Sequence, residues 1–198
     1  FSSNYGMPSI SYRLADIQRV ETGKKWYGAL YPKLIFKNDL KILDKVLVMS
    51  IIRQESRFDQ RGKSPARAQG LMQILPSTAA FIMRDRGYRG KLRHDLLIPE
   101  KNILIGEKYI QHLYKEPLIN NDIIKLLAAY NGGPGNLNKW LKKVNFDKDP
   151  LLLIETIPSR ETRNYIKEVL KNYYVYNNKF SYNDSSFEEL ASGNWIIK

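Results

Sequence analysis

The chain has 198 residues, enough for one domain or for one domain with an extension. A hydrophobic fraction of 43% supports a buried core, and the absence of cysteine excludes disulfides and thiolate metal sites. The net charge of +12 indicates attraction to a polyanion, which includes nucleic acid, anionic lipid and acidic cell-wall polymers. His94 and His112 have no metal-ligand spacing, so no metal site is predicted.

The first part of the chain reads as a connecting segment. No apolar run reaches membrane-spanning length, and the chain begins with Phe1 without a visible signal peptide, so we expect a mature or excised fragment. After an irregular start, the spacing of Leu14, Ile17 and Val20 predicts an amphipathic helix over residues 11–21. An aromatic turn follows, and residues 1–32 are interpreted as a linker or packing segment.

A long apolar run predicts a central helix over Leu40–Ile52, with Asn38 as its cap. Its apolar residues fall on more than one face, which indicates a buried helix. Glu55 continues one of its apolar stripes, and desolvation at the end of a buried helix raises the pKa of a carboxyl group. Such a group suits general acid catalysis at neutral pH. The alternative is a solvated glutamate paired with Arg53 or Arg57.

Proline and glycine divide the remaining sequence into short helices and loops. Loops are predicted over residues 59–69 and 88–98, and a helix is predicted from Pro76 to a stop at Gly87. Further helical segments are predicted over 99–116, 122–130, 137–144 and 161–176, the last one capped by Ser159, and a short turn is predicted over 149–154. No run alternates cleanly between polar and apolar residues. The predicted class is therefore all-α, with room for a small β-hairpin in a loop.

Four short patches combine polar groups with residues that end helices, namely 54–56, 64–73, 128–133 and 161–165. Singly, each is compatible with a helix end, a turn, a helix stop or a solvated face. Together they resemble the soluble lytic murein transglycosylase family, through Glu55-Ser56, Gly70-Leu71-Met72-Gln73, Ala129-Tyr130-Asn131, and Glu161-Thr162-Arg163 with Tyr165. The resemblance runs from about Leu30 to Tyr174. Arg67 and Gly132 depart from it, because many members of the family carry Gly and Ala there.

This resemblance implies a lysozyme-like helical catalytic domain over residues 33–176, after the linker of residues 1–32 and before a C-terminal tail of residues 177–198. It implies a lyase that cleaves the β-1,4 bond between N-acetylmuramic acid and N-acetylglucosamine in peptidoglycan. The product is a 1,6-anhydromuramic acid, and no water is consumed. The resemblance implies a monomeric domain that binds glycan strands in the periplasm or cell envelope. It implies no metal or organic cofactor, no binding of nucleic acid and no stable membrane insertion.

The resemblance also implies roles for individual residues. Glu55 is the catalytic acid and then the base, with assistance from the 2-acetamido group of the substrate. Among the substrate-binding residues, Ser64 and Gln73 hold Glu55 or the acetamido group, and Tyr165 orients the acetamido group. Met72 and Tyr130 provide walls for a sugar face. Asn131 forms hydrogen bonds, and Glu161 fixes the substrate or Arg163.

Three alternatives remain open from the residues. A hydrolase on the same fold would need a second carboxylate, for which Asp59 and Asp95 are the candidates. A non-catalytic glycan-binding module would keep the fold without the reaction. A basic nucleic-acid binder is motivated by the net charge alone, since no recognition motif accompanies it.

Overall fold

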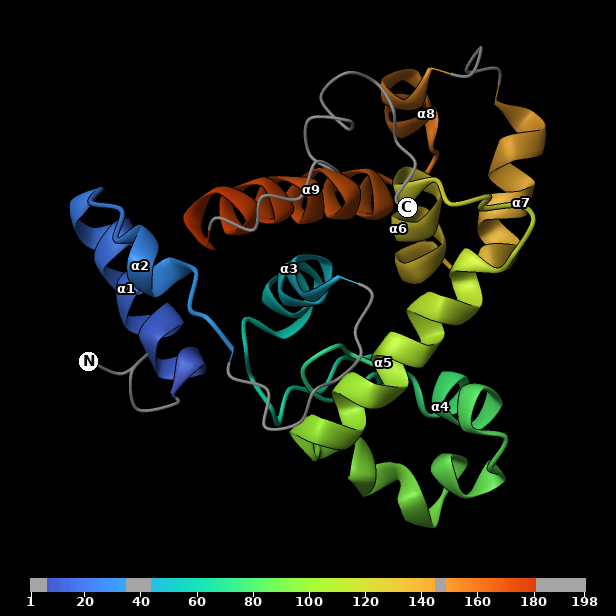
Figure 1. Ribbon diagram of the computed structural model, residues 1–198, viewed down its shortest axis with the longest axis horizontal. Helices are drawn as coiled ribbons and strands as arrows, with labels where there is room; N and C mark the ends of the chain where they lie inside the picture. Colours follow the sequence, from blue (N-terminus) through green and yellow to red (C-terminus); the bar gives the residue numbers. More distant parts are fainter. Residues whose placement is uncertain (1–6, 35–43, 145–148, 181–198) are drawn as a thin grey trace. The chain divides into compact units, whose positions relative to one another are not determined.

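The computed structural model describes residues 7–34, 44–144 and 149–180. Every regular element in these ranges is helical, as predicted, in the order α1 (Pro8–Thr22), α2 (Tyr27–Leu30), α3 (Lys45–Ser56), α4 (Pro76–Met83), η1 (Arg86–Arg89), η2 (Lys91–Leu97), α5 (Pro99–Tyr114), α6 (Ile123–Gly132), α7 (Pro134–Lys143), α8 (Pro150–Thr156) and α9 (Arg160–Phe180) (Figure 1). The chain divides into two compact units, Phe1–Glu107 and Lys108–Lys198. Within the described ranges, none of the helices combines the length and the apolarity that crossing a membrane requires.

The first unit contains the buried helix α3. Asp44 caps it, because its Oδ1 accepts hydrogen bonds from the backbone N–H groups of Val46 at 2.7 Å and Leu47 at 3.0 Å. Asp44 itself has extended backbone, so the prediction of one continuous helix from Leu40 is wrong. The predicted cap Asn38 lies outside the described residues. All residues from 46 to 52 are buried, which confirms that α3 is an interior helix.

The apolar face predicted for the first helix is wrong. The helix forms, but Leu14, Ile17 and Val20 are 60%, 54% and 71% exposed. The buried residues of α1 include Ser11 and Ala15, whose small side chains allow the close approach of α2, which contacts α1 (Figure 1). The hydrophobic spacing predicted the presence of the helix, but the contact with α2 determined which face is buried.

The predicted loop over residues 88–98 is also wrong, because η1 and η2 occupy most of it. Asp85 caps η1 through its Oδ1, which accepts the N–H of Gly87 at 2.8 Å. Tyr88 and Leu96 are 7% and 0% exposed and anchor these two short 3-10 helices. Tertiary burial of two side chains thus orders a segment whose local pattern is too irregular to predict a helix.

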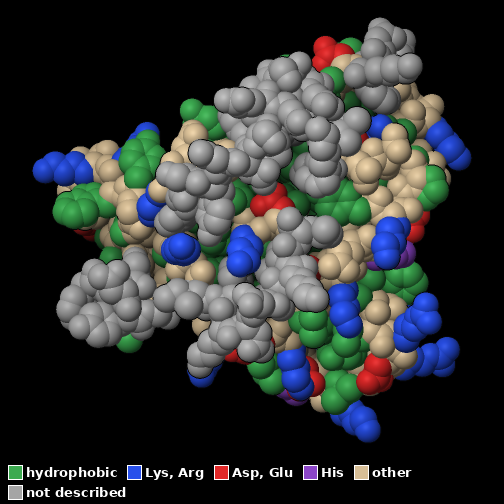
Figure 2. Space-filling model, in the orientation of Figure 1, with side chains coloured by type: hydrophobic (Ala, Val, Ile, Leu, Met, Phe, Trp, Pro, Cys, Tyr) green, Lys and Arg blue, Asp and Glu red, His purple; other side chains and the backbone are tan. Residues whose placement is uncertain are grey.

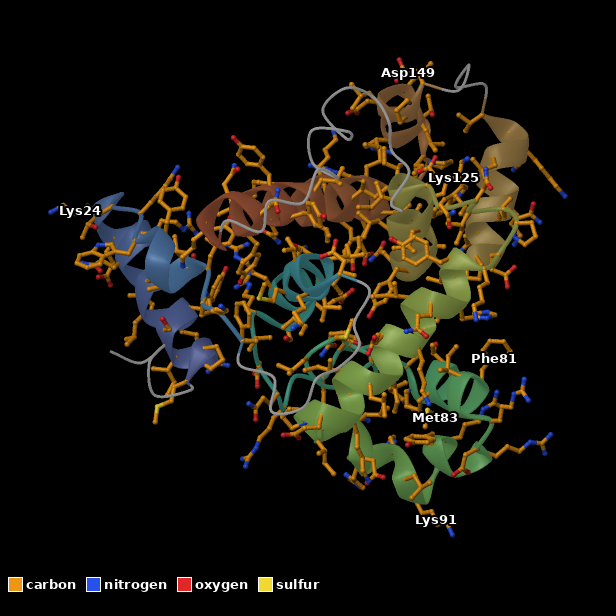
Figure 3. The ribbon with its side chains drawn as sticks, viewed as in Figure 1. Lys24, Phe81, Met83, Lys91, Lys125 and Asp149 are labelled. Atoms are coloured by element: carbon orange, nitrogen blue, oxygen red, sulfur yellow. The ribbon has the colours of Figure 1, made fainter. Side chains whose placement is uncertain are left out.

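The lobe formed by α4, η1 and η2 carries both basic and apolar side chains on its outer surface. α4 ends where Arg84 adopts left-handed backbone with φ 54°, so the stop predicted at Gly87 lies too far along the chain. Figure 2 shows several lysine and arginine side chains around this lobe, at the lower right. Phe81 and Lys91, both labelled in Figure 3, lie on its outside, and Phe81 is 62% exposed.

In the second unit, α6 contacts α7 and α9, and α8 contacts α9. Side-chain caps begin α6, α8 and α9, as local rules require, whereas α7 begins at Pro134. Asp122 accepts from the N–H groups of residues 124 and 125 ahead of α6, and Asp149, labelled in Figure 3, accepts from those of residues 151 and 152 ahead of α8. Ser159 accepts from Thr162 N at 3.1 Å, which confirms it as the cap of α9. α9 continues to Phe180, and the predicted tail beyond it lies outside the described residues.

Candidate active site

The predicted site residues divide between the two units: Glu55, Ser64, Met72 and Gln73 belong to the first, and Tyr130, Asn131, Glu161 and Tyr165 to the second. Among the described residues, no three histidine, aspartate or glutamate side chains lie close enough together to hold a metal ion.

Glu55 lies in the last turn of α3 and is half-buried. It continues the stripe of Leu47 and Ile51, which are 1% and 0% exposed. The helix ends directly after it, because Arg57 and Phe58 both adopt left-handed backbone with φ 51° and 66°. The carboxyl group thus stands at the end of a buried helix, where it is partly desolvated.

The Gly70–Gln73 turn is held by Asn102 of α5. Asn102 Oδ1 accepts the N–H of Met72, and its Nδ2 donates to the carbonyls of Gln69 and Leu96, each at 2.8 Å. Asn102 is 0% exposed, so these bonds form where no water competes for them. A Cβ on Gly70 would lie 2.2 Å from the Leu96 carbonyl oxygen, so only glycine fits at that position.

Gln73 is held in an uncommon conformation. Its backbone has φ 47°, and its Nε2 donates to the carbonyl of Gly70 at 2.8 Å. Non-glycine residues with positive φ are strained, and such residues cluster at functional sites. The side chain is half-buried and packs over Gly62, where an added Cβ would lie 3.0 Å from Nε2.

Met72 is fully buried, at 0% exposure. A Cβ on Gly106 would lie only 2.3 Å from the Met72 sulfur, so the thioether fills the space that this glycine leaves in α5. Asn102 and Gly106 are four residues apart and therefore share one face of α5. This face supports the turn by a hydrogen bond from Asn102 and by the room that Gly106 leaves for the Met72 side chain. Whether Met72 also lines a sugar subsite stays a prediction.

Ser64 stabilises the loop that precedes the turn. Its Oγ accepts the N–H of Ala68 at 3.0 Å, and its own N–H donates to the Ala68 carbonyl at 3.0 Å. The small hairpin allowed for in this region is reduced to two isolated antiparallel bridges, Lys63 with Gln69 and Gln69 with Ile74, and the described part of the chain forms no strand. A direct role of Ser64 toward substrate stays a prediction.

In the second unit, three tyrosines form a row. The ring centroid of Tyr130 lies 5.3 Å from that of Tyr109 at 42° and 6.4 Å from that of Tyr165 at 8°. Tyr130 is half-buried, and Tyr165 is 5% exposed. Burial raises the pKa of Tyr109 to about 12, so its hydroxyl stays protonated at any physiological pH.

Asn131 is linked to the beginning of α9. Its Oδ1 accepts the hydroxyl of Thr162 at 2.7 Å, and that hydroxyl lies 3.0 Å from the Oγ of Ser159. Glu161 is exposed in the first turn of α9, where a carboxylate is favoured by the helix dipole. Arg163 donates from Nη1 to the carbonyl of Ile157. The predicted roles of Asn131 and Glu161 toward substrate stay predictions.

The two departures from the family pattern have structural explanations. Arg67 has φ 68°, a conformation that glycine adopts without strain, and it is exposed. A Cβ on Gly132 would lie 2.5 Å from Cη2 of Trp140 in α7, so the indole occupies the space of an alanine methyl. This chain therefore pairs a glycine with a large ring.

Three contributors were not predicted as site residues: Asn102, Tyr109 and Trp140. Asn102 and Tyr109 both lie on α5, and a polar residue within an apolar helix was the available signal for Asn102. Nothing local distinguishes Trp140 from an ordinary core residue of α7. The importance of Trp140 becomes visible only in the structure, where its ring lies against Gly132.

Comparisons with known proteins find similar chains. The family model described as the transglycosylase SLT domain matches residues 34–152. The soluble lytic murein transglycosylase of Salmonella typhimurium is 38% identical over 165 residues, covering 78% of this chain and 25% of that protein. The Escherichia coli protein of the same description is 37% identical over 171 residues, covering 81% and 26%. The chain thus spans about a quarter of the length of these curated relatives.

A solved structure is similar over most of the chain. The crystal structure of the 70 kDa soluble lytic transglycosylase from Escherichia coli matches with a TM-score of 0.76 and 30% sequence identity. The match covers 90% of this chain and 29% of that one. The similarity therefore extends beyond residues 34–152 into the flanking helices.

Proposed function

Since this chain belongs to the transglycosylase SLT domain family, we propose that it is the catalytic part of a lytic transglycosylase that acts on peptidoglycan. The bond cleaved is the β-1,4 linkage between N-acetylmuramic acid and N-acetylglucosamine. The product carries a 1,6-anhydro ring, because an internal hydroxyl replaces water as the final nucleophile.

In the proposed mechanism, Glu55 acts twice. Its protonated carboxyl group donates a proton to the glycosidic oxygen, and the C1–O bond breaks as the carbonyl oxygen of the substrate's 2-acetamido group bonds to C1. The Glu55 carboxylate then removes the proton of the C6 hydroxyl, whose oxygen displaces the acetamido oxygen from C1. Glu55 regains its proton, so the sequence balances without water or cofactor.

The observation that supports this proposal is that Asp59 and Asp95, the two carboxylates considered for a hydrolase, each pair with a cation. Asp59 Oδ2 pairs with Arg13 at 2.9 Å, and its Oδ1 accepts the N–H of Arg61 at 3.0 Å. Asp95 pairs with Lys101 at 2.6 Å. A retaining glycosidase needs a second carboxylate about 5 Å from the acid and free to attack C1. Assistance by the substrate removes that requirement.

Each of the two units carries groups that suit recognition of a sugar with an acetamido group. The Gly70–Gln73 turn offers a fixed amide at Gln73, and the tyrosine row offers aromatic faces, which suit the apolar faces of pyranose rings. The net charge of +12 suits stem peptides with free carboxylates. A substrate of this kind places the protein in the periplasm or cell envelope.

The test is digestion of purified peptidoglycan sacculi by the chain and by its Glu55→Gln variant, with the products identified by mass spectrometry. We expect anhydro-muropeptides from the unaltered chain and a loss of about 10³-fold or more with the variant. Asp59→Asn and Asp95→Asn are the matched controls, and each should retain activity within about threefold, since both carboxylates form exposed ion pairs.

Other outcomes would identify the alternatives. Products with a free reducing end, one water heavier, together with a large loss in Asp59→Asn or Asp95→Asn, would indicate a hydrolase. Binding to sacculi without product release from the unaltered chain would indicate a glycan-binding module.

A further inference from the structure

The helices α1 and α2 contact the end of α3 through Arg53. Its guanidinium carbon lies 4.0 Å from the ring centroid of Tyr31 and 5.2 Å from that of Tyr12. Its Nε donates to the carbonyl of Leu30 at 3.0 Å. Tyr12, Leu30 and Tyr31 are 8%, 4% and 4% exposed, and cation–π attraction is stronger in such surroundings than in water. These four residues form what we call the Arg53 clamp.

Two further contacts join the same elements just after Glu55. Phe58 is fully buried, and its ring centroid lies 6.2 Å from that of Tyr12. Arg13 donates to Asp59 at 2.9 Å, but this pair is exposed and contributes little. Tyr12 is thus shared by the clamp and by the turn that follows α3.

Glu55 lies in sequence between Arg53 and Phe58. The last turn of a helix lacks partners for its carbonyl groups and tends to fray, so a residue there needs support from outside the helix. Side chains two residues apart point to different faces, so Arg53 can hold the helix without occupying the face of Glu55. A displacement of about 1 Å in a reacting group can cost about 100-fold in rate.

We propose that the Arg53 clamp positions Glu55, by holding the last turn of α3 against α1 and α2. This inference rests on the proposed function, in which Glu55 transfers the proton. We assign Arg53 as a positioning residue, since its contacts described above are with Tyr12, Leu30 and Tyr31. Residues 7–34 then serve catalysis and are more than the linker or packing segment that the sequence suggests.

The test compares Arg53→Lys with Arg57→Lys. Both changes keep the charge, but lysine lacks the planar fork that stacks on tyrosine and bonds to the Leu30 carbonyl. Arg57 is exposed and lies outside the clamp, so it is the matched control. The readouts are kcat and KM for anhydro-muropeptide release, the melting temperature, and amide hydrogen exchange over residues 53–59.

For Arg53→Lys we expect kcat to fall by about tenfold, KM to stay within about twofold, and exchange over residues 53–59 to accelerate. Arg57→Lys should stay within about twofold in every kinetic constant and leave the exchange unchanged. A selective loss of kcat distinguishes misplacement of Glu55 from weaker substrate binding.

A second pair of variants tests the aromatic part of the clamp. Tyr12→Phe keeps the ring and should keep kcat within about twofold, whereas Tyr12→Leu should lower kcat about as much as Arg53→Lys. The double variant Arg53→Lys with Tyr12→Leu should lose less than the product of the two single losses, because both changes break the contact between Arg53 and Tyr12.

The proposal is overturned if Arg53→Lys keeps kcat and the exchange pattern, or if it lowers the melting temperature alone, which would make Arg53 a structural anchor. Failure of the proposed function gives a different result. The unaltered chain would then release no anhydro-muropeptides, while the exchange over residues 53–59 would still report whether the clamp holds the end of α3.

Discussion

The Gly70–Gln73 turn of the first unit and the tyrosine row of the second unit hold their residues by different means. Asn102 fixes the turn with three hydrogen bonds of 2.8 Å, and Gly70 has no room for a Cβ. The row, Tyr109 with Tyr130 and Tyr165, is held by ring contacts at 5.3 and 6.4 Å. Hydrogen bonds weaken steeply with distance and angle, whereas ring contacts tolerate shifts. We therefore expect substitutions that add or remove a few atoms to destabilise the turn strongly and the tyrosine row less.

The largest effect is expected from Gly70→Ala. The added methyl would lie 2.2 Å from the Leu96 carbonyl oxygen and 2.4 Å from Asn102 Nδ2, at a φ of 77°. We expect the free energy of unfolding to fall by about 3–4 kcal/mol, measured by urea denaturation. Gly135→Ala is the control, since nothing lies within 4 Å of its added Cβ, and it should raise stability by about 0.5–1 kcal/mol in a helix. Equal effects of the two changes would contradict this account of the turn.

Asn102→Ala should be next. It removes the partner of the buried Met72 N–H and one hydrogen bond from each of the Gln69 and Leu96 carbonyls, which we expect to cost about 2–4 kcal/mol of unfolding free energy. Peptidoglycan cleavage should fall with it, because the backbone that carries Gln73 loses its support. Asn138→Ala, at an exposed position of α7, should change neither quantity measurably. A stable, fully active Asn102→Ala variant would mean that the turn holds itself.

Gly132→Ala tests the second unit. Its methyl would lie 2.5 Å from the Trp140 ring, so we expect a loss of about 1–3 kcal/mol in thermal or urea unfolding. Combined with Trp140→Phe, which shortens the ring, the loss should be at least about 0.5 kcal/mol smaller than the sum of the two single losses. Strict additivity would show that the indole does not exclude the methyl.

The buried hydroxyl of Tyr109 should make the free energy of unfolding depend on pH in the alkaline range. Burial raises its pKa to about 12 in the folded chain, while the unfolded value is about 10, so the folded state binds the proton more tightly. Stability should be unaffected by this group below pH 10 and should fall as pH rises from about 10 to 12, by up to about 2 kcal/mol. Tyr109→Phe should flatten the curve of unfolding free energy in that window, and an unchanged slope would argue against the burial of this hydroxyl.

The smallest effect is expected from Arg67→Gly. Because Arg67 has φ 68° and is exposed, glycine should relieve strain and raise the unfolding free energy by about 0.5 kcal/mol, with activity unchanged. Arg61→Gly is the matched control, an exposed arginine with negative φ, and it should lower stability by about 0.5–1 kcal/mol. Opposite signs in a chemical denaturation series would support the conformational explanation, and equal signs would contradict it.

Much of this protein was predictable from the sequence because the rules involved are local. A helix cap joins atoms within three residues, so Ser159 could be assigned before α9 was seen, and the stops at Gly23 and Gly133 follow from the same kind of rule. Glu55 at the end of a buried helix follows from the spacing of the apolar residues before it. These features depend on positions a few residues apart.

Only the tertiary structure could determine the rest, because it depends on residues that are distant in sequence. The side of α1 that packs was chosen by α2, so Leu14 is exposed although its spacing suggests burial. Asn102 lies thirty residues from Met72, whose N–H it accepts. The requirement for glycine at position 132 is apparent only from the packing of α7 on α6, which brings the Trp140 ring against this position. Spacing along the chain can identify an amphipathic helix or a buried amide, but the partner of each is selected by packing, where shape and hydrogen bonds from distant segments must fit at once.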